Sequence, residues 1–198
     1  MAVRFSDIAS SGKKAGVKIG SKEAIDWFRA KALAIRSANP KLIISKSPKI
    51  KRKTSIGPGS MGQMFLFSYD PKGKETLPFY DTYPLVFPIE YYGDSFLGLN
   101  MHYLPPVLRA RLMDALYDTI NNNDYDEGTM LKISYKILAG ASQFSYFKPC
   151  VKKYLFNHVG SSFMYINPDE WDIALMLPTE RFAKASKSQV WADSRSKV

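Results

Sequence analysis

The side chains best suited to catalysis or metal binding are few in this chain. It has two histidines, His102 and His158, and one cysteine, Cys150. Nucleophilic catalysis needs a nucleophile, a base and an orienting group in contact, and nothing local supports a pair formed by Cys150 and His158. Two histidines and one cysteine do not complete the usual four-ligand zinc site. We therefore expect no catalytic residue and no metal site, and we interpret both histidines as partly buried polar residues.

Phosphate-binding and carboxylate-based sites are also absent from the sequence pattern. The glycine-rich stretch GPGSMG at 57–62 is not followed by Lys-Ser or Lys-Thr, and no helix is expected to begin there. The carboxylates are scattered, without a pair spaced for glycoside hydrolysis or two-metal chemistry. We therefore expect no bound cofactor and no enzymatic activity.

Aromatic residues gather in the middle of the chain, and two interpretations remain open for them. Interleaved with Lys72 and Lys74, they resemble the base-stacking surface of strand-face nucleic-acid binders, although no RNP-like motif is present. The interpretation that we favour divides them between the core and a protein interface. The residues concerned are Phe65, Phe67, Tyr69, Phe79, Tyr80, Tyr83, Phe87, Tyr91, Tyr92, Phe96 and Tyr103.

A second group of cations lies in the segment KPCVKKYL. Lys148, Lys152 and Lys153 fall near the expected start of a helix opened by Pro149. They form either a modest basic patch or an ordinary solvated helix face, and the second interpretation is the simpler one.

The net charge of +10 is concentrated in the N-terminal third. Residues 1–60 carry 14 lysines and arginines but three acids, whereas the other residues carry 14 lysines and arginines against 15 acids. This asymmetry favours a basic arm that docks on an acidic partner; a solubilising tail without a partner is the alternative. The partner-binding residues that we predict in this arm are Trp27, Phe28, Lys49, Lys51, Arg52 and Lys53.

Hydrophobic periodicity and turn signals divide the chain into an arm and a globular part. In the arm, a helix at 22–37 is followed by a proline-broken basic linker at 41–59. Strands are expected at 63–69, 85–92 and 96–103, with a tight turn at Gly93-Asp94. The Pro105-Pro106 pair marks the change to helices. These are expected at 106–120, at 130–140 with Thr129 as cap, at 149–160, after Asn167, and from Thr179 towards Trp191.

These elements predict an α+β fold. A small, bent antiparallel sheet of SH3-like size is followed by a helical C-terminal part, and an extended basic arm precedes both. We place the arm at residues 1–59 and one globular α+β domain at residues 60–198.

The sequence also indicates where the protein is made. It has no apolar run near the roughly 20 residues of a membrane span, and its Ser/Gly/Lys-rich N-terminus lacks the apolar core of a secretory signal. A single cysteine excludes an intrachain disulfide. We therefore expect synthesis in a reducing cytoplasm and no membrane partner.

Three long segments resemble known proteins. They are MFLFSYDPKGKETLPFYDTYPLVFPIE at 64–90, FLGLNMHYLPPVLRARLMDAL at 96–116 and FMYINPDEWDIALMLPTERF at 163–182. Together they resemble small structural proteins of T4-like contractile-tailed bacteriophages, over roughly residues 60–192. The resemblance contains no catalytic motif and supplies no site residues.

The resemblance implies a virion component made in the host cytoplasm. The first interpretation is a tail baseplate or hub protein, present in several copies and docked on neighbouring virion proteins through its basic arm. The alternative is a nucleic-acid-binding protein that protects packaged DNA ends or completes the head.

Overall fold

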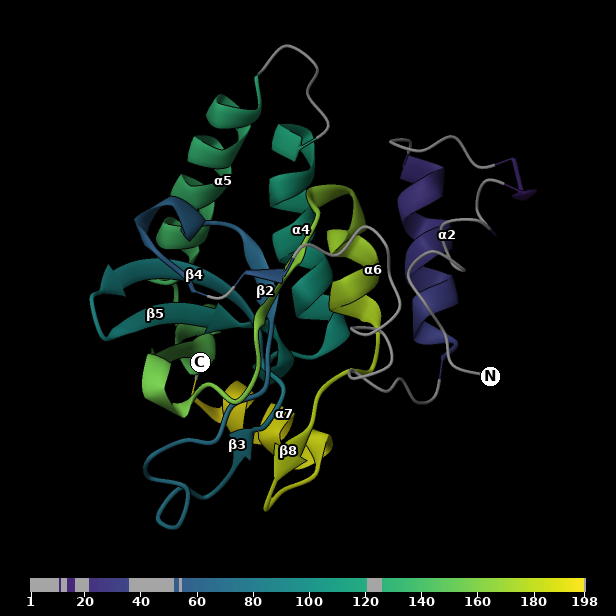
Figure 1. Cartoon of the computed structure of the whole chain (residues 1–198). Coiled ribbons are helices and arrows are strands. Elements are labelled where there is room, and N and C mark those ends of the chain that lie inside the picture. The colour runs from purple at the N-terminus through teal and green to yellow at the C-terminus, as the bar shows by residue number, and fades with distance from the viewer. Residues whose placement is uncertain are drawn as a thin grey trace.

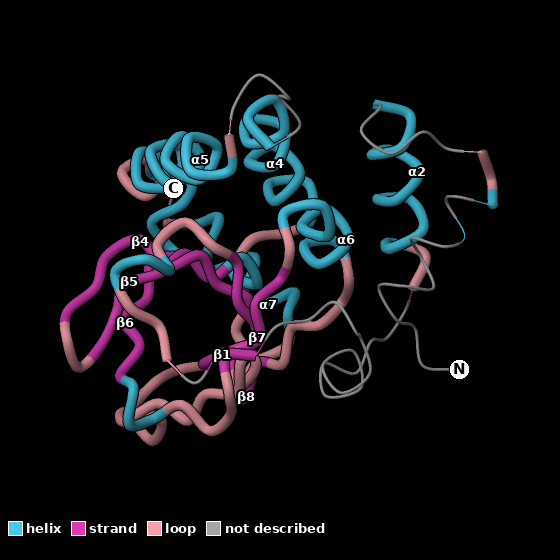
Figure 2. The backbone as a smooth tube through the Cα atoms, turned by 45° about the horizontal axis from the view of Figure 1, so that its top comes forward, coloured by secondary structure: helices cyan, strands magenta, loops and turns pink. Residues whose placement is uncertain are grey.

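A strongly curved antiparallel sheet organises the part of the chain that the computed structural model describes: residues 11, 14–16, 22–35, 52–53, 55–120 and 126–197. Within these ranges six strands pair in the order β1-β7-β2-β4-β5-β6. The strands are β1 (Arg52–Lys53), β2 (Met64–Leu66), β4 (Leu85–Tyr92), β5 (Ser95–Asn100), β6 (Val151–Leu155) and β7 (Phe163–Ile166). Figure 2 shows how the sheet curls, with β1 and β7 at one end and β6 at the other.

Helices pack against this sheet, and a two-stranded sheet joins its lower edge (Figure 1). The helices are α2 (Lys22–Leu33), α4 (Pro106–Ile120), α5 (Glu127–Ala141), α6 (Trp171–Met176) and α7 (Lys187–Ser196). The small sheet pairs β3 (Tyr80–Asp81) with β8 (Phe182–Ala183). The α+β class expected from the sequence is confirmed. In the described ranges, no helix combines the length and the apolar character that crossing a bilayer requires.

The bend of the sheet has a local cause in the β4–β5 hairpin. The register between these strands shifts between Pro88 and Glu90, as expected where a proline removes a ladder donor. Gly98 faces Pro88 across the ladder, and a Cβ atom at Gly98 would collide with the Val86 side chain. The two strands approach closely here because Gly98 has no side chain.

Two groups of buried side chains fill the two faces of the sheet. One is an aromatic group in which Phe67 contacts the rings of Phe96, Tyr154 and Phe163 at centroid distances of 6.0, 5.4 and 4.9 Å. The other lies under the helices, where the Trp171 ring of α6 packs edge-on against Phe87 of β4 at 4.8 Å. Such aromatic pairs bury large areas and prefer this geometry.

The first helix is tied to the rest of the fold by an arginine. The Arg29 guanidinium on α2 lies 2.9 Å from Asp114 of α4 and 3.1 Å from Asp172 of α6. Burial alone would lower the pKa of Arg29, but the two carboxylates outweigh it and raise the pKa. The division into an arm at 1–59 and a domain at 60–198 stays a prediction, and most of the expected linker lies outside the described residues.

Several of the expected elements are confirmed. Strand β4 has the expected bounds, the turn at Gly93-Asp94 joins it to β5, and α4 begins at Pro106. Helix α5 starts earlier than expected, because Asp126 caps it by accepting a hydrogen bond from the Thr129 amide at 2.8 Å.

The helix expected at 149–160 is wrong. This segment contains the end of a 3₁₀ turn, η3 (Ser145–Cys150), and then the edge strand β6, which pairs with β5 from Ser95 to Leu99. The pairing joins residues more than 50 positions apart, so local periodicity could not reveal it. The last helix also begins later than expected: residues 182–183 form β8, and Ser186 caps α7 in a capping box with Gln189.

Candidate nucleic-acid interface

A cleft of about 520 Å³ lies between β6, α7 and the loop that leads into β3. We call it the lysine cleft. Its basic wall consists of Lys148, Lys152, Lys153 and Lys197. Its aromatic wall consists of Tyr69, Phe79, Tyr80, Tyr103 and Tyr154. Cations beside aromatic rings are the two components with which proteins hold single-stranded nucleic acid.

Each part of the cleft comes from a different element of the fold. The turn η3 supplies Lys148, strand β6 supplies Lys152, and the C-terminal part of α7 supplies Ser194 and Lys197. The opposite wall, residues 71–80, is held by Lys184, whose Nζ donates to the carbonyl oxygens of Lys74, Glu75 and Leu77 at 2.6, 2.9 and 3.2 Å. The cleft therefore depends on pairing between distant segments.

Lys152 is the most enclosed cation of the cleft. Its Nζ lies 4.3 Å from the centroid of the Tyr103 ring, within the range of a cation–π contact. Burial lowers the pKa of Lys152, and the nearby charge of Lys197 lowers it further. Burial also raises the pKa of Tyr103, so this phenol stays protonated. The site thus keeps a poorly hydrated positive charge over a neutral ring.

The acids near the cleft already have partners. Asp193 accepts from Lys197 Nζ at 2.6 Å on the same helix. Asp81 is 3% exposed, and its carboxylate accepts from the Asn100 amide at 3.1 Å and from the Tyr83 backbone at 3.0 Å. The remaining lysines of the wall, Lys148, Lys152 and Lys153, form no ion pair with a carboxylate among the described residues. The cleft is consequently suited to an anion.

Beneath the cleft lies a polar chain that resembles an acid–base–nucleophile relay. His102 Nδ1 is 2.7 Å from Asp81 Oδ2, and His102 Nε2 is 2.9 Å from Thr179 Oγ1. However, His102 is 0% exposed and Thr179 is 2% exposed, so no substrate atom can reach either. The chain satisfies buried polar groups and connects β3, η2 (Met101–Tyr103) and the segment before β8.

No local sequence pattern indicates this arrangement around His102. Asp81 and Thr179 lie 21 and 77 residues away, without a recognisable motif. Cys150 is buried too, and burial raises the pKa of its thiol to about 12, which favours the protonated thiol at neutral pH. His158 is partly exposed, and its Nδ1 lies 2.8 Å from the Asp70 carbonyl oxygen.

The aromatic residues of the middle segment occupy two kinds of position, the core and the lining of the lysine cleft. Phe65, Phe67, Phe87 and Phe96 are fully buried core residues. Four others, Tyr69, Phe79, Tyr80 and Tyr103, line the lysine cleft. The basic patch at Lys148, Lys152 and Lys153 is likewise part of the cleft, carried by a turn and a strand instead of the expected helix.

Of the six residues predicted to bind a partner, the structure describes the side chains of Trp27 and Lys53, and neither lines this cleft. Trp27 is partly buried against the core. Lys53 Nζ donates to Gln63 Oε1 at 2.8 Å and lies 5.5 Å from the centroids of the Phe65 and Tyr165 rings. The Phe28 and Arg52 side chains, and all of Lys49 and Lys51, are outside the described structure. Partner binding by these residues stays a prediction.

A second cavity of about 440 Å³ lies between α4 and α5 and differs in character. Its lining includes Leu108, Leu112, Ile137 and the 64% exposed Phe144, with Arg111 and Lys136 as its cations. It lacks the convergent lysines of the first cleft, which remains the better candidate for a nucleic-acid site.

Comparison with known proteins gives one match. Neither the curated proteins nor the solved structures contain a match to this chain. The sequence model of one family, the phage T4 terminal DNA protecting protein, matches residues 26–195. The match includes the sheet, α4, α5, α6, most of α2 and α7, and the lining of the lysine cleft apart from Lys197. It also confirms the resemblance to T4-like phage proteins. The chain therefore belongs to the family of the phage T4 terminal DNA protecting protein.

Proposed function

We propose that this protein binds the ends of linear DNA and shields them, and that it does so without catalysis. The family's description refers to protection of terminal DNA, which is the alternative function expected from the sequence. The tail-baseplate interpretation receives no support from this match. We place DNA binding at the lysine cleft, because four lysines and five aromatic side chains line this one cleft.

The chemistry of the cleft fits binding better than turnover. Lysines supply the phosphate contacts that dominate the affinity of proteins for DNA. Phe79 and Tyr80, the partly exposed rings of the wall, offer stacking surfaces to unpaired bases, which only an end or a single strand can present. Cys150 and the chain formed by Asp81, His102 and Thr179 are sealed from substrate, which supports a role without reaction chemistry.

Location in the virion and contact with other virion proteins belong to the same proposal. A protein that guards packaged DNA ends has to travel with the DNA. Trp27 and Lys53, the predicted partner residues whose side chains the structure describes, do not line the lysine cleft and would leave it open to DNA. Several copies in a symmetric assembly remain a prediction.

The test compares linear and circular DNA of one sequence. Fluorescence anisotropy should show tighter binding to a short linear duplex than to a minicircle, and the bound duplex should resist exonuclease digestion. The double variant Lys148→Met, Lys152→Met should lose at least about tenfold in affinity for ends, since each contact with a phosphate contributes through counterion release. Equal affinity of the wild type for linear and circular DNA would refute end recognition.

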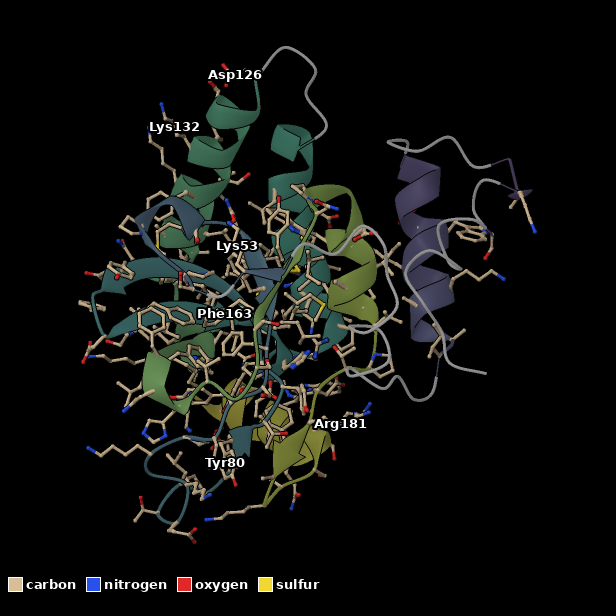
Figure 3. All side chains as sticks on the ribbon, in the orientation of Figure 1. Lys53, Tyr80, Asp126, Lys132, Phe163 and Arg181 are labelled. Carbon is tan, nitrogen blue, oxygen red and sulfur yellow. The ribbon has the colours of Figure 1, made fainter. Side chains whose placement is uncertain are left out.

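A matched control removes the same charge elsewhere. Lys132 and Lys136 are exposed residues of α5, and Figure 3 shows Lys132 at the opposite end of the molecule from Tyr80. Lys132→Met, Lys136→Met has the same net charge as the cleft variant. It should keep its preference for ends, whereas a loss equal to that of the cleft variant would assign binding to overall charge.

A further inference from the structure

We infer that the lysine cleft holds the phosphomonoester of one terminal nucleotide, with its base against the aromatic wall. This inference rests on the proposed function, which it makes more specific. DNA-end binding alone requires contacts with internal phosphates only. A receptor for the terminal phosphomonoester distinguishes a phosphorylated end from a hydroxyl end.

The first observation is a buried hydroxyl without a partner. Ser194 is 3% exposed and lines the cleft, and its Oγ has no hydrogen-bond partner among the described residues. Buried hydroxyls normally have a partner, so one at a cleft that has none in the protein is available to a ligand. A hydroxyl donates well to a phosphate oxygen.

The second observation is the charge beside this hydroxyl. Lys148, Lys152 and Lys197 line the same cleft, and Lys197 is in the same turn of α7 as Ser194. Burial lowers the pKa of Lys152, and this lysine forms no ion pair with a carboxylate among the described residues. An anion in the cleft would supply the missing ion-pair partner. Lys197 is paired with Asp193, which leaves the ammonium groups of Lys148 and Lys152 to balance a dianion. A phosphomonoester carries close to two charges at pH 7, whereas an internal phosphodiester carries one.

The third observation is the volume of the cleft, together with the aromatic rings on the wall opposite the lysines. A volume of about 520 Å³ lies in the range of small-molecule sites and is adequate for a nucleotide, not for a duplex. Phe79 and Tyr80 line this wall and are partly exposed, so their rings are accessible to a base. The Asp81 carboxylate next to them is 3% exposed and accepts from four donors, among them the Arg181 amide at 3.3 Å, so its oxygens are turned to protein donors.

The experiment uses the full chain and hairpin duplexes that have a single end. The ends carry a 5′-phosphate, a 3′-phosphate or hydroxyls only, and anisotropy gives each Kd. One of the phosphorylated ends should bind at least about tenfold tighter than the hydroxyl end, as expected for new charge-assisted hydrogen bonds. A nucleoside monophosphate should displace the hairpin, and the nucleoside should not.

Variants assign the preference to the cleft. Ser194→Ala should reduce the preference for phosphate about threefold, Lys152→Met should abolish it, and Lys132→Met should leave it unchanged. Circular dichroism melting verifies that each variant folds. If wild-type protein prefers linear DNA but binds all three ends equally, the phosphomonoester inference is wrong while the proposed function stands. If it does not prefer linear DNA, the proposed function fails as well.

Discussion

The Arg109 guanidinium and the Glu180 carboxylate lie 3.8 Å apart inside the protein, with their side chains 1% and 5% exposed. Arg109 also donates to the carbonyl oxygens of Leu104 at 2.7 Å and Leu175 at 2.8 Å. Burial lowers the pKa of Arg109, although Glu180 opposes this effect. Glu180 is thus the counter-charge of an arginine that links α4 to the end of α6.

Removal of this counter-charge should destabilise the protein. Glu180→Gln leaves Arg109 buried without compensation, which should cost about 3 kcal/mol in the free energy of unfolding, measured with urea. Lys187→Met is the control, because Lys187 also contacts Glu180, at 3.4 Å, but its own side chain is 48% exposed and should contribute less than about 1 kcal/mol. Equal losses in the two variants would contradict a special role for the Arg109 pair.

The ion pair of Arg109 and Glu180 also predicts that the free energy of unfolding depends on pH. Burial would raise the pKa of Glu180, but Arg109 and nearby positive charge outweigh it, and the pKa lies below its usual value of 4.5. The unfolded chain therefore takes up this proton first as the pH falls. The stabilisation is complete above about pH 4.5 and is lost as the pH falls through the lowered pKa. The difference in urea stability between wild type and Glu180→Gln should accordingly shrink below pH 4.5, and a constant difference would exclude this linkage.

The His102 chain predicts a contrast between two substitutions at Thr179. Thr179→Val removes the hydroxyl next to His102 Nε2 and leaves a buried polar atom unsatisfied, at a cost of about 1–3 kcal/mol. Thr179→Ser keeps the hydroxyl and should cost less. Urea unfolding measures both. If Thr179→Val kept full stability and yet abolished protection of DNA ends, the hydrogen-bonded residues Asp81, His102 and Thr179 would have a functional role instead of a structural one.

The attachment of α2 depends mainly on the more buried of its two ion pairs. Asp172 is 15% exposed and Asp114 is 62% exposed, and both contact Arg29. Asp172→Asn should therefore speed hydrogen exchange in α2 and cost about 2 kcal/mol, whereas Asp114→Asn should cost less than about 1 kcal/mol. The reverse order of the two effects would show that burial does not decide their strength.

Substitution of two glycines in the β4–β5 hairpin should change the stability of the protein by different amounts. Gly98→Ala places a methyl group against Val86 and 3.2 Å from the Phe87 carbonyl oxygen, and overpacking of this kind costs about 1–3 kcal/mol. Gly93 has φ of 54° and open space around it, so Gly93→Asn should be nearly neutral. Thermal melting compares the two; similar losses would contradict the close approach at Gly98.

Lys184 should control the wall of the lysine cleft. Its backbone has φ of 67°, and its amine binds three carbonyl groups of the loop at 74–77. Lys184→Met loses the amine, whereas Lys184→Gly loses the amine and also the backbone strain. Both should increase hydrogen exchange at 74–77, and the glycine variant should be the more stable by about 1 kcal/mol. Unchanged exchange in both variants would show that the amine does not hold the loop.

Local patterns in the sequence predicted the elements that local forces determine. The β4–β5 hairpin and the start of α4 at Pro106 followed from alternation, a glycine turn and a proline in the first helical turn. Strand β6 was missed because its partner, β5, lies more than 50 residues earlier. Its sequence VKKYL also alternates too little to separate a strand from a helix.

The candidate site was predictable only in pieces. Lys148, Lys152 and Lys153 were recognised as a basic group, and Tyr103 as an aromatic that could contact bases. Their placement on one cleft with Ser194 requires α7 to fold back beside η3, and no spacing in the sequence indicates that contact. The polar chain at His102 has the same origin, because tertiary packing brings its three residues together.

The strand order also determines when the sheet can form during translation. Strand β2 lies between β4, made soon after it, and β7, whose Ile166 pairs with Met64 about a hundred residues earlier in the chain. At about 5–20 residues per second, a ribosome leaves that edge of β2 unpaired for roughly 5–20 s. An unpaired edge is a template for association with other chains, and it is exposed on every nascent copy until β7 has been made. The sheet can therefore close only near the end of translation.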